Sequence, residues 1–287
     1  MTAPPGPGTD RSGPSGLAVG DLLTWEPITV DGPAPATALA IGAHPDDIEF
    51  GCGATLAKWA SAGSRLHHLV LTDGSKGSWD PGADIAALVA EREAECRTAA
   101  DVIDGHPGAT SRRDDRVQFL GRVDGELVNG VDERRDVARI IRMLRPTVVL
   151  GHDPWRRYRL HPDHRAAGFI MLDAVVAARD PHFFTELGID PYRPERLLLF
   201  EADQPNHIED AGGFADTKVE ALLCHRSQWE STMHIDQDPG PTAGTPSAGA
   251  VARQRTAFAA KVARQLAAHG SLSGLEAAEA FHMITEV

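Results

Sequence analysis

The feature that most constrains the fold of this chain is an alternation of short apolar segments with longer amphipathic ones. The short segments are almost continuously apolar, which is typical of strands that a parallel sheet buries on both faces. The candidate strands are Thr37–Ala43, Leu66–Thr72, Val117–Leu120, Pro146–Gly151 and Arg196–Phe200.

The longer segments carry apolar residues at every third or fourth position, which is the helical period. The helices predicted from this spacing are Gly53–Ala62, Asp84–Ile103, Asp132–Leu144 and Pro162–Ala178, with an alanine-rich one over Val251–His269. Strands that alternate with helices form parallel sheets that are covered on both faces. We therefore expect an α/β, Rossmann-like, doubly wound fold with a mostly parallel sheet.

The chain is predicted to form one domain over residues 21–287, preceded by a tail. Residues 1–20 are rich in Pro, Gly and Ser and lack the basic start and apolar core of a signal peptide, so we expect them to be disordered. Residues 235–250 are rich in Pro and Gly and have no apolar periodicity, which predicts a mobile loop. No segment has the roughly 18 consecutive apolar residues of a membrane-spanning helix, so we expect a soluble, cytoplasmic protein.

The charge balance limits the partners of the protein, because 41 acidic residues face 28 basic ones and give a net charge of −13. Such a surface repels nucleic-acid phosphates and anionic membranes, so a neutral or cationic small molecule is the expected ligand. The cysteines (Cys52, Cys96 and Cys224) form no CxxC motif, which argues against a disulfide framework and suits a reducing cytosol. The sequence does not set the oligomeric state, and a homo-oligomer is compatible with it.

Polar residues gather directly after the candidate strands, at the edge where open parallel sheets bind their ligands. The motif "HPDD" (44–47) follows the first strand, and "HPDH" (161–164) follows the fourth. His and Asp side chains readily bind divalent ions. Two histidines and one carboxylate from these motifs would form a zinc site with an open position for water, the usual design of a hydrolytic zinc centre.

These motifs resemble those of the PIG-L/LmbE-type zinc N-deacetylases, which include N-acetylglucosaminylphosphatidylinositol deacetylases and the deacetylases and amidases of mycothiol and bacillithiol metabolism. The pair "AHPDD" and "HPDH" carries the resemblance, and "TDGSKG", "REAE", "FLGRVDG" and "HRSQ" are similar to the family in content and order. The similarity extends from about Ala36 to about Gln228. It implies a metal-dependent hydrolase.

The resemblance also implies a role for each residue of the two motifs. His44, Asp47 and His164 correspond to the metal ligands, which hold Zn²⁺ or another divalent ion. Asp46 corresponds to the general base, and His161 to an acid or an electrostatic stabiliser. Two adjacent acids make sense, because a carboxylate that binds the metal cannot also accept a proton. The implied reaction removes an N-acetyl group from an N-acetylglucosamine-type amino sugar or conjugate.

The candidate substrate-binding residues are Arg92, Asp124, Lys76 and Tyr158. Polar side chains of fixed geometry give specificity to sugar pockets, and Arg92 and Asp124 resemble family positions most closely. Some relatives have a tyrosine two residues before the first His of "HPDH". In this chain Arg159 holds that position and Tyr158 comes one residue earlier, so the role of Tyr158 stays open. Asp163 is interpreted as a helix cap or as a partner of a ligand.

Two other functions stay open at this stage. One is an amidase that removes a larger acyl group from a glucosaminide thiol conjugate, since pocket walls set the acyl size. The other is a catalytically silent carbohydrate-binding protein, against which the presence of Asp46 argues. Taken alone, "HPDD" is also typical of a turn or helix cap, because Asp side chains accept backbone N–H groups there. The pairing with "HPDH" favours the metal site.

Overall fold

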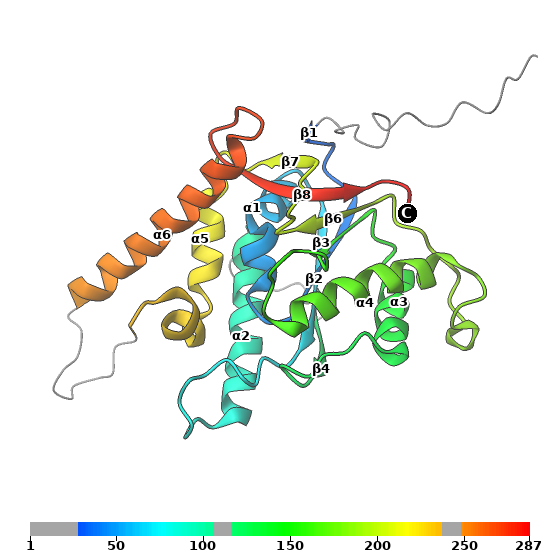
Figure 1. The fold of residues 1–287 in the computed structure, drawn as a ribbon, viewed down its shortest axis with the longest axis horizontal. Coiled ribbons are helices and arrows are strands. Elements are labelled where there is room, and N and C mark those ends of the chain that lie inside the picture. The colour runs from blue at the N-terminus through cyan, green and yellow to red at the C-terminus, as the bar shows by residue number, and fades with distance from the viewer. Residues whose placement is uncertain (1–27, 106–115, 237–247) are drawn as a thin grey trace, which may run out of the picture.

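The structure is a computed structural model that describes residues 28–105, 116–236 and 248–287 (Figure 1). The predicted tail over residues 1–20 lies outside the described residues, as does most of the predicted loop over 235–250. The end of that range, 248–250, belongs to a long C-terminal helix instead of a loop, because the helix begins before its first predicted residue, Val251.

The predicted parallel sheet is confirmed, and every predicted strand is present. These strands are β2 (Thr37–Gly42), β3 (Arg65–Thr72), β4 (Val117–Arg122), β5 (Val148–His152) and β6 (Arg196–Phe200). They pair in parallel in the order β6-β5-β2-β3-β4. Because β2 and β5 are neighbours, the chain segments that follow them leave the sheet at the same edge.

The remaining strands have no clear signal in the sequence. β1 (Thr29–Val30) and β7 (His207–Asp210) pair in parallel, whereas β8 (Ala278–Ile284) lies between β7 and β6 and is antiparallel to both. In β8, the buried carboxylate of Glu279 accepts hydrogen bonds from the backbone N–H groups of Ala54 and Thr55. A buried acid interrupts the apolar run that normally marks a strand.

Helices cover both faces of the sheet, as predicted. They are α1 (Asp47–Ser61), α2 (Ile85–Ile103), α3 (Val131–Leu144), α4 (Pro162–Arg179), α5 (Ala215–Leu223) and α6 (Ala248–Gly270), with short 3₁₀ or π segments at Thr185–Leu187, Arg226–Gln228 and Trp229–Met233. Helices α3 and α4 pack on one face, and α1 and α2 on the other. Helix α5 packs against α1, and α6 lies beside α5 and β8 (Figure 1). Among these helices of the described segments, none has the length and apolarity of a membrane span.

Helix α1 begins at Asp47, so the predicted start at Gly53 is wrong. Its first turn carries Asp47 and Glu49, whose negative charges suit a helix N-terminus but hide the apolar spacing. The helix bends at Cys52, where φ is −148°. Asp46 precedes the helix with a left-handed φ of 110°, which is strained for a residue other than glycine. This turn separates the side chains of the two adjacent acids.

Helix α4 passes unusually close to the end of β5. His161 is its N-cap residue and Pro162 occupies its first turn. A Cβ atom at Gly168 would lie 2.6 Å from the carbonyl oxygen of His152, so only glycine permits this approach. The close packing brings the first turn of α4, with Asp163 and His164, next to the residues that follow β2.

Candidate metal centre

The three predicted metal ligands converge from two distant segments of the chain. The Nδ1 atom of His44 lies 3.2 Å from Nε2 of His164 and 3.3 Å from Oδ2 of Asp47. The same His164 nitrogen lies 3.4 Å from Oδ1 of Asp47. A tetrahedral ion with bonds of about 2.0–2.1 Å has ligands roughly 3.3 Å apart. The spacing of the donor atoms therefore fits a small divalent ion.

The described residues contain three overlapping groups that could hold a metal ion. They are His44–His161–His164, Asp47–His152–His164 and His44–Asp124–Asp163. His152 is the donor absent from the sequence prediction: its Nε2 atom lies 3.2 Å from Oδ2 of Asp47, and its ring stacks on His164 with centroids 4.4 Å apart. The predicted set of His44, Asp47 and His164 is not itself one of these groups. It draws its members from the first two, and Asp47 faces His44 with Oδ2 and His164 with Oδ1. The third group is the competing arrangement.

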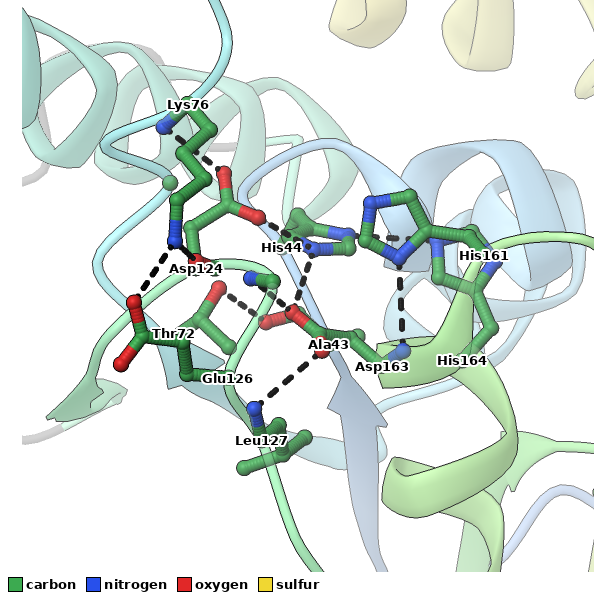
Figure 2. A network of polar contacts seen from close by, with 12 residues as sticks. Ala43, His44, Thr72, Lys76, Asp124, Glu126, Leu127, His161, Asp163 and His164 are labelled. Carbon is green, nitrogen blue, oxygen red and sulfur yellow. Dashed lines mark hydrogen bonds and ion pairs between the residues drawn. The ribbon is translucent and has the colours of Figure 1, made fainter.

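Two carboxylates fix the orientation of His44, as Figure 2 shows. Its Nε2 atom lies 3.2 Å from Oδ2 of Asp163 and 3.2 Å from Oδ1 of Asp124. Burial lowers the pKa of His44, but these acceptors and Asp47 outweigh burial and hold the pKa well above its ordinary value. An Nε2–H group that donates to carboxylates leaves Nδ1 to face His164 and Asp47, which is how carboxylate partners orient metal-binding histidines.

Asp163 is fully buried and is engaged on both oxygens. Its Oδ2 atom accepts the backbone N–H of Gly125 at 2.6 Å, and Oδ1 accepts that of Leu127 at 3.2 Å. Hydrogen bonds from His44 and Gly125 outweigh burial and lower its pKa. Asp163 is thus a rigid acceptor behind His44, in the position that the sequence analysis gave to a partner of a ligand.

Replacing Asp163 with asparagine is expected to weaken metal binding by about 10–100-fold, because the charged acceptor behind His44 is lost. Titration of the metal-free protein with Zn²⁺ under competition from a chelator measures this change. Asp173→Asn is the matched control, because Asp173 lies on the same helix and bonds the exposed Asn129 side chain. Equal affinity in the Asp163→Asn and wild-type proteins would contradict the assignment.

Asp46 lies beside the triad but has different surroundings. It is 7% exposed, and its Oδ2 atom is 3.8 Å from the guanidinium of Arg92. Burial raises the pKa of Asp46 to about 6, even though Arg92 opposes that rise. For Asp47, by contrast, His164 and His152 outweigh burial and hold the pKa well below its usual value. One carboxylate thus stays ionised among imidazoles, while its neighbour has the pKa of a base for reactions near neutral pH.

Arg92 connects the loops on either side of Asp46. Its guanidinium donates to the carbonyl oxygens of Gly74 and Pro45, both at 2.8 Å. Gly74 has a φ of +65°, and a Cβ atom there would lie 2.8 Å from the Arg92 side chain. Arg92 lines the cavity as expected of a substrate-binding residue, and these contacts also give it a part in holding the site together.

Lys76 and Asp124 join two further loops at the same rim (Figure 2). The backbone N–H of Lys76 donates to Oδ2 of Asp124, and its ammonium contacts the Asp124 carbonyl oxygen and Glu126. Burial raises the pKa of Asp124, but the hydrogen bond from His44 dominates and lowers it to about 2. Both residues line the cavity, so the structure brings them together with the metal ligands.

Arg159, rather than Tyr158, lies beside the metal ligands. Tyr158 is 93% exposed and is not among the residues that line the cavity. Arg159 donates from Nε to Nδ1 of His164 at 2.8 Å, and from Nη1 to Glu201 at 2.8 Å. If Nε2 of His164 bound a metal ion, Nδ1 of the neutral ring would carry the proton and could not accept a hydrogen bond from Arg159. The guanidinium would then have to turn away from His164 and donate to Glu201 alone. Burial lowers the pKa of His164 to about 3, which keeps the ring neutral.

His161 is the most accessible imidazole of the cluster. Its ring lies edge-on to that of His44, with centroids 4.6 Å apart, and its Nδ1 atom accepts the backbone N–H of Asp163. Burial and the neighbouring charge of His44 lower its pKa. It lines the cavity and is free to meet a substrate on the open side of the triad.

The triad opens into a cavity of about 470 Å³ that is within the usual range for small-molecule sites. Part of its wall comes from helix α6, through Phe258, Lys261, Val262 and Gln265. No motif marks these residues in the sequence. They reach the site because Phe258 and Val262 pack with Ala54 and Leu222 in a separate apolar cluster that seats α6 over α5.

Together, the fold and the site define an α/β protein with a histidine–carboxylate metal-binding group at the carboxyl end of its parallel strands. Residues 39–175 match the model of the PIG-L family, described as GlcNAc-PI de-N-acetylase. The chain belongs to the PIG-L family, as its sequence motifs imply.

Curated relatives agree with this assignment. The chain is 32% identical over 194 residues to the diacetylchitobiose deacetylase of Thermococcus kodakarensis, covering 67% of this chain and 69% of that enzyme. It is 34% identical over 166 residues to the 1D-myo-inositol 2-acetamido-2-deoxy-alpha-D-glucopyranoside deacetylase of Kineococcus radiotolerans, covering 50% of this chain and 46% of that enzyme.

The fold is also that of a solved family structure, the N,N'-diacetylchitobiose deacetylase of Pyrococcus horikoshii. The match has a TM-score of 0.72 at 25% identity and covers 88% of this chain and 84% of that one. This likeness extends beyond the residues matched by the family model and includes most of the described chain.

Proposed function

We propose that this protein is a metal-dependent hydrolase that removes an N-acetyl group from an N-acetylglucosamine-type amino sugar or conjugate. The observation that carries the proposal is the convergence of His44, Asp47 and His164 at metal-binding distances, with Asp46 beside them in the same cavity. The relatives named above act on N-acetylated sugars by name, and the site has the groups that such a reaction needs.

Zn²⁺ is the ion we propose for the triad. Two imidazole nitrogens and one carboxylate are a common ligand set of hydrolytic zinc sites, although other divalent ions bind such donors too. When bound, the ion supplies an acidified water and polarises the carbonyl of the scissile amide.

Asp46 and His161 then divide the proton transfers. Asp46 accepts a proton from the attacking water, for which its pKa of about 6 is well placed. The His161 imidazole, on the open side of His44, stabilises the negative charge that develops on the carbonyl oxygen. The C–N bond breaks, and the amine leaves with a proton from Asp46 or His161. The products are acetate and a free amino sugar.

The cavity wall provides the groups that recognise the sugar. Lys76, Arg92 and Asp124 line the cavity with charged or polar atoms of fixed position. Sugar hydroxyls both donate and accept hydrogen bonds, so a mixed set of cations and carboxylates suits them. Tyr158 does not belong to this set, because its side chain is exposed to solvent and does not line the cavity.

Acetate release from a panel of N-acetylhexosamines and their glycosides tests the proposal. We expect the Zn²⁺-loaded protein to release one acetate for each amine formed, and a chelator to abolish the release. Substrates with acetyl, propionyl and longer acyl groups separate a deacetylase from an amidase for larger acyl groups. Binding of the glycosides without any acyl release would instead indicate a silent carbohydrate-binding protein.

A further inference from the structure

A second cavity of about 520 Å³ adjoins the catalytic one. Phe50, Glu201 and Gln265 line both cavities, so the two share a wall. The second cavity lies between the C-terminal half of α6, the start of α1 and the ends of β6 and β8. The second cavity is therefore the space next to a sugar that is bound in the first.

Most charged groups of the second cavity are already neutralised by neighbours. The buried Lys218 ammonium donates to Glu279 at 2.5 Å and to the carbonyl oxygen of Phe50 at 2.7 Å. Glu201 pairs with Arg159 and lies near His152. The Lys218–Glu279 pair and the Glu201 carboxylate thus form a rigid wall that offers little net charge to a ligand.

Arg156 is the exception among the described residues of this cavity. Its guanidinium contacts the carbonyl oxygen of Glu201, and no carboxylate of the described residues forms an ion pair with it. An arginine has five N–H donors, so most of the donors of Arg156 are available. His269, which also lines the cavity, has a buried Nδ1 atom without a hydrogen-bond partner. The carboxylate of the exposed Asp203 also lies within the field of Arg156, because hydrogen bonds from Arg157 and then the charges of Arg157 and Arg156 lower its pKa. The cavity thus combines a cation that has free N–H donors with an unsatisfied ring nitrogen.

We propose that the second cavity binds the aglycone of the substrate, and that Arg156 selects aglycones that carry an anionic oxygen group, a carboxylate or a phosphate. The proposal rests on the proposed function, because it places the acetylated sugar in the first cavity. The planar guanidinium can donate two parallel hydrogen bonds to a carboxylate or a phosphate. The apolar side chains of Phe50, Leu266 and Leu272 line the rest of the cavity and suit the uncharged body of the aglycone.

A matched pair of substrates tests this inference: 4-carboxyphenyl and 4-carbamoylphenyl N-acetylglucosaminide, which share one shape and differ in charge. We expect wild-type kcat/KM to favour the carboxylate by about tenfold or more, which is the effect of a hydrogen bond to a charged group. Arg156→Gln should bring the ratio close to one, and Arg156→Lys should keep part of it. A 4-phosphophenyl glycoside shows whether phosphate or carboxylate is preferred.

Arg157→Gln is the control variant, because Arg157 is the adjacent exposed arginine, pairs with Asp203 and lines neither cavity. It should retain the wild-type ratio. The deacetylated glucosaminides are also titrated into the wild-type protein by calorimetry, which reads the same preference without turnover. Equal affinity for the carboxylate and carbamoyl compounds would overturn the role of Arg156. Absence of acetate release from every glycoside, with the binding preference intact, would overturn only the proposed reaction.

Discussion

Replacing Asp46 with asparagine is expected to lower kcat by about 10²–10⁴-fold, the usual contribution of a positioned general base. The amide has nearly the shape of the carboxylate but cannot accept the proton of the attacking water. Asp46 is no part of the ligand triad, so the metal content should stay at the wild-type level. Acetate-release kinetics together with elemental analysis of the same preparation measure both quantities.

Asp153→Asn provides the control for this change. Asp153 directly follows β5 at the same edge of the sheet, but its carboxylate accepts the backbone N–H of Trp155 and does not line the catalytic cavity. Its kcat should remain near that of the wild type. If Asp46→Asn protein hydrolysed its substrate as fast as the wild type, another group would have to be the base.

The central part of the fold was predictable, because the apolar pattern that marks each of its strands lies within one short segment of the sequence. Strands such as Val148–His152 are continuously apolar, since a parallel sheet buries both of their faces. The antiparallel edge was not predictable, because β8 contains Glu279, a buried acid whose hydrogen-bond partners are Lys218, Ala54 and Thr55. These partners come from α1 and α5, far away in the sequence.

The candidate site likewise has a part that the sequence predicts and a part that it does not. The rule that ligands bind at the carboxyl ends of parallel strands suffices to bring residues 44–47 and 161–164 to one rim. His152 ends β5 at the same rim, where it contacts Asp47. The contact of Arg159 with His164 depends instead on the path of the loop after β5, which no periodicity encodes. Arg156 in the same loop was missed for the same reason, and its cavity exists only once α6 is in place.

Replacing His164 with alanine is expected to remove the metal ion and, with it, activity. Loss of a carboxylate behind a ligand already weakens metal binding by about 10–100-fold, so loss of a ligand itself should exceed about 100-fold. His44 and Asp47 alone leave two of the three protein ligands that a hydrolytic zinc site needs. Metal stoichiometry after dialysis, followed by acetate release with added Zn²⁺, measures the effect.

The same variant distinguishes the predicted triad from the competing donor group. His44, Asp124 and Asp163 could hold an ion without His164, and such a site would survive the His164→Ala change with its metal intact. Both groups that contain His164 would lose a donor, so depletion of the metal supports an ion on the side of Nδ1 of His44. His182→Ala, at an exposed histidine beyond α4, should retain the wild-type stoichiometry and shows that the loss is specific to the site.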